Sequence, residues 1–338
     1  MALCASAAWA QPDPSGIDFI TIGDAGNIGY NGFAGGSVMG RGRVDYEYRL
    51  GRTEVTTAQW MEFYNTFGGR GLGITTPLRW GARFTGNPER WYELSDVPNA
   101  ADIPARGMSW RTCAMYCNWL CNGKSSDASA IANGAYDIST FGYVGQNYTD
   151  QETHNADARY WIPTYDEWIK AAYYDPNKSG PGQAGWWTVT PNRSETRLIY
   201  DVPGVGQANA GFFFSNRSEY LIPLGAYPQT FSPWGMIDAA GGTSEFLESS
   251  TSVSGLRLRM AKGSSAGGGL LDARTLDYIS GYGTPFPSET DELYGLRVAA
   301  IVPNLGTVSV LMFGVLGSSF QRRRQCERIL NGSGSGAG

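Results

Sequence analysis

The chain has 338 residues, of which 46 are glycine, 13% are aromatic and only 17% are charged. This composition predicts a loop-rich globular body in which large rings supply much of the core and turns take up the glycine. A formal net charge of −5, with no basic stripe along the body, excludes a typical nucleic-acid-binding surface.

The N-terminal segment Met1 to Ala10 is apolar and ends in Ala8-Trp9-Ala10, which Gln11-Pro12 follows. An A-x-A signature of this kind marks the cleavage site of secretory signal peptides. We therefore interpret residues 1–10 as a signal-peptide remnant. The protein is expected to be exported to the cell surface or the extracellular space.

The body that follows, residues 16–302, is predicted to open with strands. Ile17 to Gly23 alternates and is rich in β-branched residues, and Tyr46 to Leu50 with Arg52 to Val55 has the pattern of a second strand. Thr56 is the predicted N-cap of a first helix, whose aromatic residues recur at helical spacing and should face the core. These residues are Trp60, Phe63, Tyr64 and Phe67.

Two further helices are predicted in the middle of the body. Ser109 is expected to cap the helix that carries three cysteines. Thr164 is expected to cap a helix from Tyr165 to Tyr174, with Glu167 completing a capping box. No helical period is longer than about four turns, which excludes a helix bundle and favours an α+β fold with little regular structure.

The five cysteines do not form a pattern typical of a disulfide framework. Cys4 lies in the signal-peptide remnant and Cys326 near the C-terminus, which leaves Cys113, Cys117 and Cys121 in the body. Their C-x3-C-x3-C spacing places all three on one face of a helix, whereas metal-binding pairs usually follow a C-x2-C spacing on turns. We interpret them as small buried hydrophobic side chains.

The C-terminal segment contains an apolar run, Leu305 to Phe320, that is followed by Arg322-Arg323-Arg324. The run is short for a spanning helix, but a basic stop directly after it fits membrane association. Residues 303–325 resemble the C-terminal sorting signals of exported bacterial proteins, which carry a Pro-Glu-Pro motif, an apolar helix and an arginine cluster. Here Asn304-Leu305 replaces the Glu-Pro, and a buried C-terminal strand or helix is the alternative. The low-complexity tail, residues 326–338, is predicted to be disordered.

Three separated segments and one closing motif carry a resemblance to a known family. They are YEYRLGRTEVTTAQWMEFYN (46–65), RYWIPTYDEWIKAAYY (159–174), SPWGMIDAAGGTSEFLES (232–249) and YGLRVA (294–299). Their order and spacing resemble the formylglycine-generating, or sulfatase-modifying-factor, family over roughly Gly16 to Val302. The resemblance implies the irregular, loop-rich α+β fold of that family, which is C-type-lectin-like.

The copper site that this resemblance implies lacks its ligands. Copper-dependent members bind Cu(I) through two cysteines that follow an R-x-x-R/K-G-G-S motif, because thiolates suit this soft ion. Residues 259–265 match the motif, with Ser265 at its serine, and the two cysteine positions fall on Gly268 and Ala273. We therefore expect a degenerate active-site pocket with no catalytic residue and no copper.

Iron is not expected either. The sulfoxide synthases that resemble this family hold nonhaem iron with three histidines, and this chain has a single histidine, His154. Asp150, Glu152 and Asp157 lie near it in the sequence and could form a mixed oxygen/nitrogen metal site with it. We instead interpret His154 as a solvated loop histidine.

The better preserved site is one for calcium. The resemblance implies that Asp238 and Glu245 supply side-chain oxygens and that Gly241 and Thr243 supply main-chain carbonyls. Ca²⁺ takes about six to eight oxygen ligands, and glycines allow the backbone to turn its carbonyls inward. A loop held only by hydrogen bonds is the alternative. A second and less complete calcium site is implied at Asn209, the Ala210 carbonyl and Asn216.

Two other motif positions are interpreted as structural. Asp166 and Glu167 are adjacent on the predicted third helix and point in different directions, so they are not expected to act as an acid/base pair. Arg297 in the closing motif is expected to be a buried guanidinium that bridges carboxylates.

Three functions remain open at this point. The leading one is an exported, calcium-stabilised binding or structural module at the cell surface that has lost copper oxidation. The alternative is a formylglycine-generating-type oxidoreductase acting on a protein cysteine or a small thiol, with Cys113 or Cys117 brought near the pocket by the fold. A further alternative is a lectin-like binder that uses the aromatic loops Trp186 to Phe214 and Gly267 to Phe286. The expected partner is a protein, peptide or glycan and not a nucleic acid, with membrane association through residues 305–320.

Overall fold

The computed structural model describes residues 12–32, 38–86, 89–209, 221–265, 284 and 286–303. The chain divides into two units, Met1–Ile301 and Val302–Gly338. Only residues 302 and 303 of the second unit are described, so the fold is that of the first unit. The signal-peptide remnant, the apolar run 305–320 and the tail lie outside the described residues. Within these ranges, no helix has the length and apolar character needed to cross a membrane.

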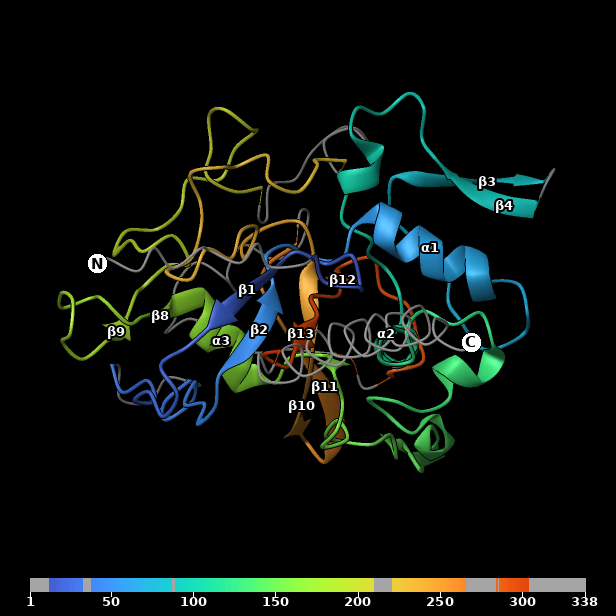
Figure 1. Ribbon diagram of the computed structural model, residues 1–338, viewed down its shortest axis with the longest axis horizontal. Coiled ribbons are helices and arrows are strands. Elements are labelled where there is room, and N and C mark those ends of the chain that lie inside the picture. Colours follow the sequence, from blue (N-terminus) through green and yellow to red (C-terminus); the bar gives the residue numbers. More distant parts are fainter. Residues whose placement is uncertain are drawn as a thin grey trace, which may run out of the picture. The chain divides into compact units, whose positions relative to one another are not determined.

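The described strands form small sheets rather than one large one (Figure 1). A four-stranded antiparallel sheet has the order β1 (Phe19–Ile22), β2 (Tyr48–Gly51), β13 (Ala299–Ala300), β7 (Tyr160–Trp161). A three-stranded sheet has the order β11 (Leu256–Lys262), β10 (Ser244–Val253), β12 (Tyr294–Gly295). Three two-stranded ribbons are β3 (Ala82–Gly86) with β4 (Glu89–Glu93), β5 (Tyr143–Val144) with β6 (Asn147–Tyr148), and β8 (Tyr174–Asp175) with β9 (Trp186–Trp187).

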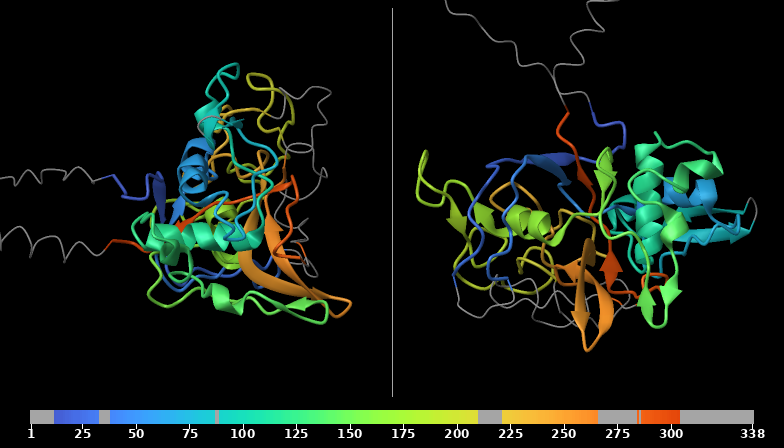
Figure 2. Two further views of the ribbon diagram at one scale, coloured as in Figure 1. Left: turned by 90° about the vertical axis from the view of Figure 1, so that its right-hand side faces the viewer. Right: turned by 90° about the horizontal axis from the view of Figure 1, so that it is seen from below.

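The four-stranded sheet joins the two ends of the folded body. Strand β13 lies between β2 and β7, so that Ala299 is opposite Leu50 on one side and Trp161 on the other. The β10–β11 pair forms a longer ribbon, drawn in orange in Figure 2. Strand β12 pairs in parallel with the first residues of β10, which brings the closing motif beside the Gly-rich turn that precedes β10.

Three α-helices, α1 (Thr57–Phe67), α2 (Trp110–Cys121) and α3 (Tyr165–Tyr173), begin at the predicted caps. The Thr56 side chain accepts from the Gln59 amide, and the Gln59 side chain accepts from the Thr56 amide in return, which forms a full capping box. Thr164 and Glu167 form the same box on α3, and Ser109 caps α2. Three short 3-10 helices, Ala100–Asp102, Ala128–Ile131 and Ile138–Thr140, complete the described helical structure.

The predicted core and fold class are confirmed. Trp60, Phe63 and Phe67 are buried, and the Trp60 ring stacks on Tyr116 of α2 with centroids 5.1 Å apart. Tyr64 is only half-buried and borders a pocket beside the β3–β4 ribbon. With three α-helices and many short strands in the described ranges, the molecule is a loop-rich α+β protein.

Candidate functional site

The Gly-rich turn before β10 lies against a buried glutamate from the first motif. Glu54 Oε1 accepts hydrogen bonds from the Thr243 amide at 2.9 Å and the Thr243 hydroxyl at 3.2 Å. Gly242 has a φ of +60°, and a Cβ there would lie 2.5 Å from Glu54 Oε2. Only glycine therefore allows the turn to approach this carboxylate so closely.

Glu54 has an unsatisfied oxygen. Its side chain is buried, and Oε2 has no hydrogen-bond partner in the described part of the chain. Burial, together with the charge of Glu245, raises the pKa of Glu54 well above its usual range. A buried carboxylate oxygen without a partner is costly unless it is protonated or bound by a cation.

Glu245, by contrast, is fully paired. Arg297 donates to both of its carboxylate oxygens, from Nη2 to Oε1 at 2.6 Å and from Nε to Oε2 at 2.9 Å. The Trp168 indole N–H of α3 also donates to Oε2, and both charged side chains are fully buried. The remaining Arg297 protons go to the carbonyls of Gly51, Arg52 and Ile237. The prediction that Arg297 is a buried bridging guanidinium is confirmed.

Asp238 adds a third carboxyl group to this region. Its Oδ2 accepts from the Gly225 amide at 2.6 Å, and desolvation raises the pKa of this half-buried side chain to about 6. Neither Asp238 nor Glu54 forms an ion pair with another described residue. We use the name acid cluster for Glu54, Asp238, Glu245 and Arg297, in which three carboxyl groups share one guanidinium.

Of the four predicted calcium ligands, Asp238 and Glu245 belong to this acid cluster, and Thr243 contacts it through its amide and hydroxyl. Glu245 faces Arg297, whereas Glu54, which is not among the predicted ligands, offers the open oxygen. Among the described residues, no three His, Cys, Asp or Glu side chains could by themselves hold a metal ion. A cation here would need Glu54 and Asp238 together with the carbonyls of Gly241 and Thr243, an all-oxygen set of the kind that Ca²⁺ accepts.

The second predicted calcium site is described only in part. Asn209 is buried, and its Oδ1 accepts from the Gly242 amide at 2.8 Å, which ties it to the same turn. Ala210 and Asn216 lie outside the described residues. In the structure, Asn209 therefore stabilises the turn that belongs to the first predicted calcium site.

Two of the three body cysteines lie in the core, as predicted, and the third packs against its edge. Cys113 and Cys117 are fully buried free thiols, and Cys121 is half-buried with its Sγ 3.4 Å from the Tyr160 carbonyl. Burial raises the pKa of all three thiols, so the reactive thiolate is disfavoured at each. Ser265 is buried and its hydroxyl has no partner in the described structure, while Gly268 and Ala273 lie outside it.

The prediction that His154 is a solvated loop histidine is wrong. Its ring stacks on Trp161 with centroids 4.5 Å apart, and Nδ1 lies 2.7 Å from Glu248 Oε2. Burial by itself lowers the pKa of His154, but the hydrogen bond to Glu248 and the charge of that glutamate leave it raised above its ordinary value. The Trp161 indole N–H in turn donates to Glu167, 3.2 Å away. We call His154, Trp161, Glu167 and Glu248 the histidine cluster.

The mixed metal site around His154 is also not formed. Asp150 pairs with Arg111 at 2.7 Å, and Glu152 pairs with Arg257. These acids are neutralised by arginines instead of facing the imidazole.

Asp166 and Glu167 point to different sides of α3, as expected. Asp166 accepts from Arg41 at 2.9 and 3.0 Å near the surface. Glu167 is fully buried and accepts from Tyr46 Oη at 2.9 Å and from the Thr164 amide at 2.7 Å. Adjacent helix positions cannot face the same bound molecule here.

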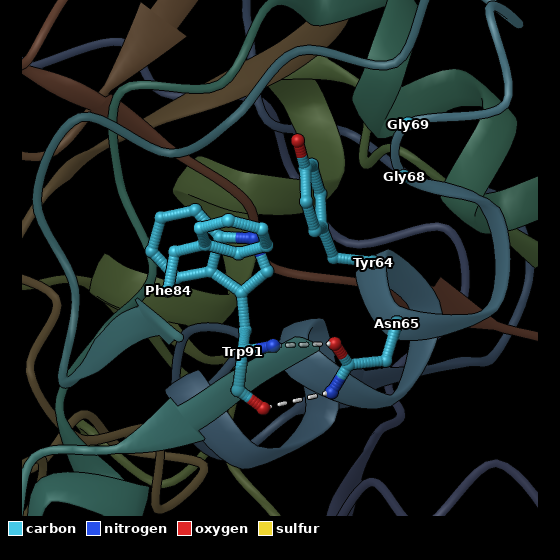
Figure 3. Close-up of a pocket in the computed structure, with 6 residues that line it drawn as sticks. All are labelled: Tyr64, Asn65, Gly68, Gly69, Phe84 and Trp91. Atoms are coloured by element: carbon cyan, nitrogen blue, oxygen red, sulfur yellow. Dashed lines mark hydrogen bonds between the residues drawn. The ribbon is translucent and has the colours of Figure 1, made fainter. Parts of the chain in front are cut away.

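Two pockets, each of about 320 Å³, are lined by residues of different elements of the body. The first, between α1 and the β3–β4 ribbon, is shown in Figure 3. It is lined by Tyr64, Asn65, Gly68, Gly69, Phe84 and Trp91. The second lies beside β9 and includes Trp186, a predicted ligand-contacting residue; its other lining residues are Tyr30, Gly32, Lys178, Trp187, Thr188, Val189 and Glu195.

Comparison with known proteins identifies one family. A family model described as the sulfatase-modifying factor enzyme 1-like domain matches residues 33–300. No curated protein matches the sequence. Among the solved structures that match, CarF is 18% identical, and the match covers 85% of this chain and 99% of CarF with a TM-score of 0.49. Treponema denticola variable protein 1 is 15% identical, and the match covers 84% of this chain and 95% of that protein with a TM-score of 0.48. PvdO from Pseudomonas aeruginosa is 13% identical, and the match covers 85% of this chain and 92% of PvdO with a TM-score of 0.42.

Proposed function

This chain belongs to the sulfatase-modifying factor enzyme 1-like domain family, and from that membership we propose that it is an exported, calcium-stabilised binding module without copper-dependent oxidase activity. The observation that carries the proposal is the acid cluster, in which Glu54 offers a buried carboxylate oxygen with no partner in the described structure. Bound Ca²⁺ would supply the missing positive charge and tie the first motif to the turn before β10. In this role the metal stabilises a binding surface and takes no part in a reaction.

The thiols support the absence of copper oxidation. The two family cysteine positions hold Gly268 and Ala273, whose side chains have no sulfur. Cys113 and Cys117, the remaining candidates, are fully buried within α2, and the pKa of each is raised. Cu(I) prefers ionised thiolates, which these positions do not provide.

The sequence supports the location of the module. Its N-terminal A-x-A signature and its C-terminal apolar run with an arginine cluster favour export and retention at the cell surface, with the membrane association proposed for residues 305–320. The partner is proposed to be a protein, a peptide or a glycan.

Thermal unfolding of the purified full chain with and without chelator tests the calcium role. A ligand that binds only the folded state stabilises it by about 2.7 kcal/mol at a hundredfold excess over Kd, so Tm should fall by several degrees in chelator and recover with Ca²⁺. Mg²⁺ should restore less, because it demands smaller and more regular coordination. Elemental analysis that found stoichiometric copper or iron, or an assay that produced an aldehyde from a cysteine peptide, would overturn the proposal.

A further inference from the structure

The pocket beside β9 contains an exposed tryptophan on a fixed base. Trp186 and Trp187 are consecutive in β9 and point to opposite faces, as neighbouring strand residues do. Trp187 is 3% exposed, whereas Trp186 is 38% exposed and borders the pocket. The exposed part of this indole provides an apolar contact surface for a ligand.

The base of the pocket is held from several directions. The Trp187 indole N–H donates to the Ile28 carbonyl at 3.2 Å, and its ring makes edge contacts with Tyr30 and Tyr174, with centroids 5.9 and 5.2 Å apart. The Thr188 amide donates to the Tyr173 carbonyl at 2.8 Å. These contacts hold the backbone of β9 in place and therefore the point from which the Trp186 side chain extends.

A charged pair provides hydrogen-bonding groups in the same pocket. Lys178 and Glu195 both line it and form an ion pair, with 29% and 56% of their side-chain surfaces exposed. An ammonium group has three donors and a carboxylate about four acceptor sites, so one mutual contact leaves most of this capacity free. The pair contributes no net charge, which favours a neutral ligand.

The pocket in Figure 3 lacks this capacity although it also contains aromatic rings. Asn65 uses its amide on the Trp91 main chain, accepting at 2.9 Å and donating at 3.1 Å, and the Tyr64 hydroxyl is bonded to Thr76 at 2.5 Å. No charged side chain is among its described lining residues. A ligand with several hydroxyls would leave them without partners there, at a cost for each one.

We infer that the pocket around Trp186 binds a neutral saccharide. The C–H face of a pyranose ring would lie on the Trp186 indole, while adjacent ring hydroxyls would accept from Lys178 and donate to Glu195. An apolar wall with a few convergent polar groups is the usual construction of a small-ligand pocket. This inference rests on the proposed binding function and names its ligand class.

The test first applies the full chain to an array of neutral glycans. The glycan that gives the strongest signal is then titrated, as the free sugar, into the protein in a calorimeter. We expect a dissociation constant on the order of 1 mM, because each hydroxyl exchanges a hydrogen bond to water for one to protein. Calorimetry is preferable to fluorescence because the chain has 11 tryptophans.

Matched variants identify the pocket. Trp186→Ala should weaken binding by about tenfold or more, and Trp186→Tyr, which keeps an aromatic face, should stay within about threefold of wild type. Trp91→Ala, in the other pocket, should bind as wild type does. The double change Lys178→Gln with Glu195→Gln keeps hydrogen-bonding groups while it removes both charges, and it should retain most of the binding.

Three results would overturn the inference: no glycan bound by the wild type, binding lost with Trp91→Ala but kept with Trp186→Ala, or binding lost completely in the double glutamine variant. Unfolding in chelator separates this inference from the calcium proposal. Calcium-dependent stability without glycan binding defeats only the saccharide inference, and glycan binding without calcium-dependent stability defeats only the calcium proposal.

Discussion

Strand β10 and helix α3 contribute to two buried carboxylate clusters that differ in the cation each contains. Glu245 of β10 pairs with Arg297 in the acid cluster, and Glu248, three residues further along the strand, pairs with His154 in the histidine cluster. A guanidinium remains charged at every pH at which a protein folds, whereas an imidazole titrates near neutrality. The charge balance of one cluster is therefore permanent, and that of the other depends on pH.

The clusters also differ in how many acids they contain for each base. The acid cluster has two further carboxyl groups, Glu54 and Asp238, which are near Arg297 but form no direct ion pair with it in the described structure. In the histidine cluster, Glu167 is satisfied by neutral donors, namely a tryptophan, a tyrosine and a backbone amide. Of the two clusters, it is therefore the acid cluster to which the proposed calcium ion is assigned.

The largest expected effect comes from removing the permanent charge. Arg297→Met leaves Glu245 buried without its counterion, and we expect the free energy of unfolding to fall by about 3–5 kcal/mol in denaturant titrations. Adding Glu245→Gln should recover part of this loss. Arg79→Met, which removes an exposed ion pair with Glu292, is the control and should cost about 0–1 kcal/mol. A loss for Arg297→Met as small as that of the control would show that the cluster does not depend on this charge.

The next effect concerns the unpartnered oxygen of Glu54. Glu54→Gln should remove the increase in stability that calcium produces, about 2.7 kcal/mol at a hundredfold excess over Kd, because the amide gives the ion no charge. Glu292→Gln, on the surface, should keep the full increase. If Glu54→Gln responded to calcium as the wild type does, the ion would have to bind elsewhere.

A smaller effect is expected in the histidine cluster, and it should depend on pH. Because the pKa of His154 is raised in the folded state, its contribution is fully present below the unfolded pKa and is lost as pH rises through the folded pKa. We expect a difference on the order of 1 kcal/mol in unfolding free energy between mildly acidic and alkaline solution, which His154→Gln should reduce. Since the chain has one histidine, an NMR titration of its ring protons reports this pKa directly. A pKa at or below that of a free histidine would contradict the expected direction.

The smallest effect is expected next to the histidine cluster, at the surface of α3. Asp166→Asn weakens an ion pair with Arg41 in which the arginine and aspartate side chains are 38% and 32% exposed, so we expect a loss below about 1 kcal/mol. Glu167→Gln, one residue away but fully buried, serves as the comparison and should cost more. Chemical denaturation of both variants measures this, and equal losses would show that burial does not separate the two acids.

Features that depend on neighbouring residues can be predicted from the sequence. Thr56, Ser109 and Thr164 are recognisable as caps because capping groups lie within about three residues of one another. Cys113 and Cys117 are buried as predicted, although nearly every other residue of α2 is buried with them, so that their spacing on one face is not the cause. The family resemblance additionally predicts that the Arg297 guanidinium is buried and that a turn lies around Gly241.

Features that depend on distant partners cannot be predicted in this way. Glu54 meets Thr243 across 189 positions and His154 meets Glu248 across 94, and no local pattern in a single sequence specifies such pairs. The only signal for Glu54 is an acid beside an apolar strand in the first motif. For His154 there is none, because its loop composition favours solvent exposure.

The position of β13 between β2 and β7 has a consequence for synthesis. A nascent chain that has been made only as far as β11 already contains β2 and β7, but it has no strand to place between them. The guanidinium of Arg297, which binds the carbonyls of Gly51, Arg52 and Ile237, is also translated after the segments that it joins. Closing contacts across so many residues is slow and entropically costly, so the body must remain incompletely folded until translation has passed residue 300.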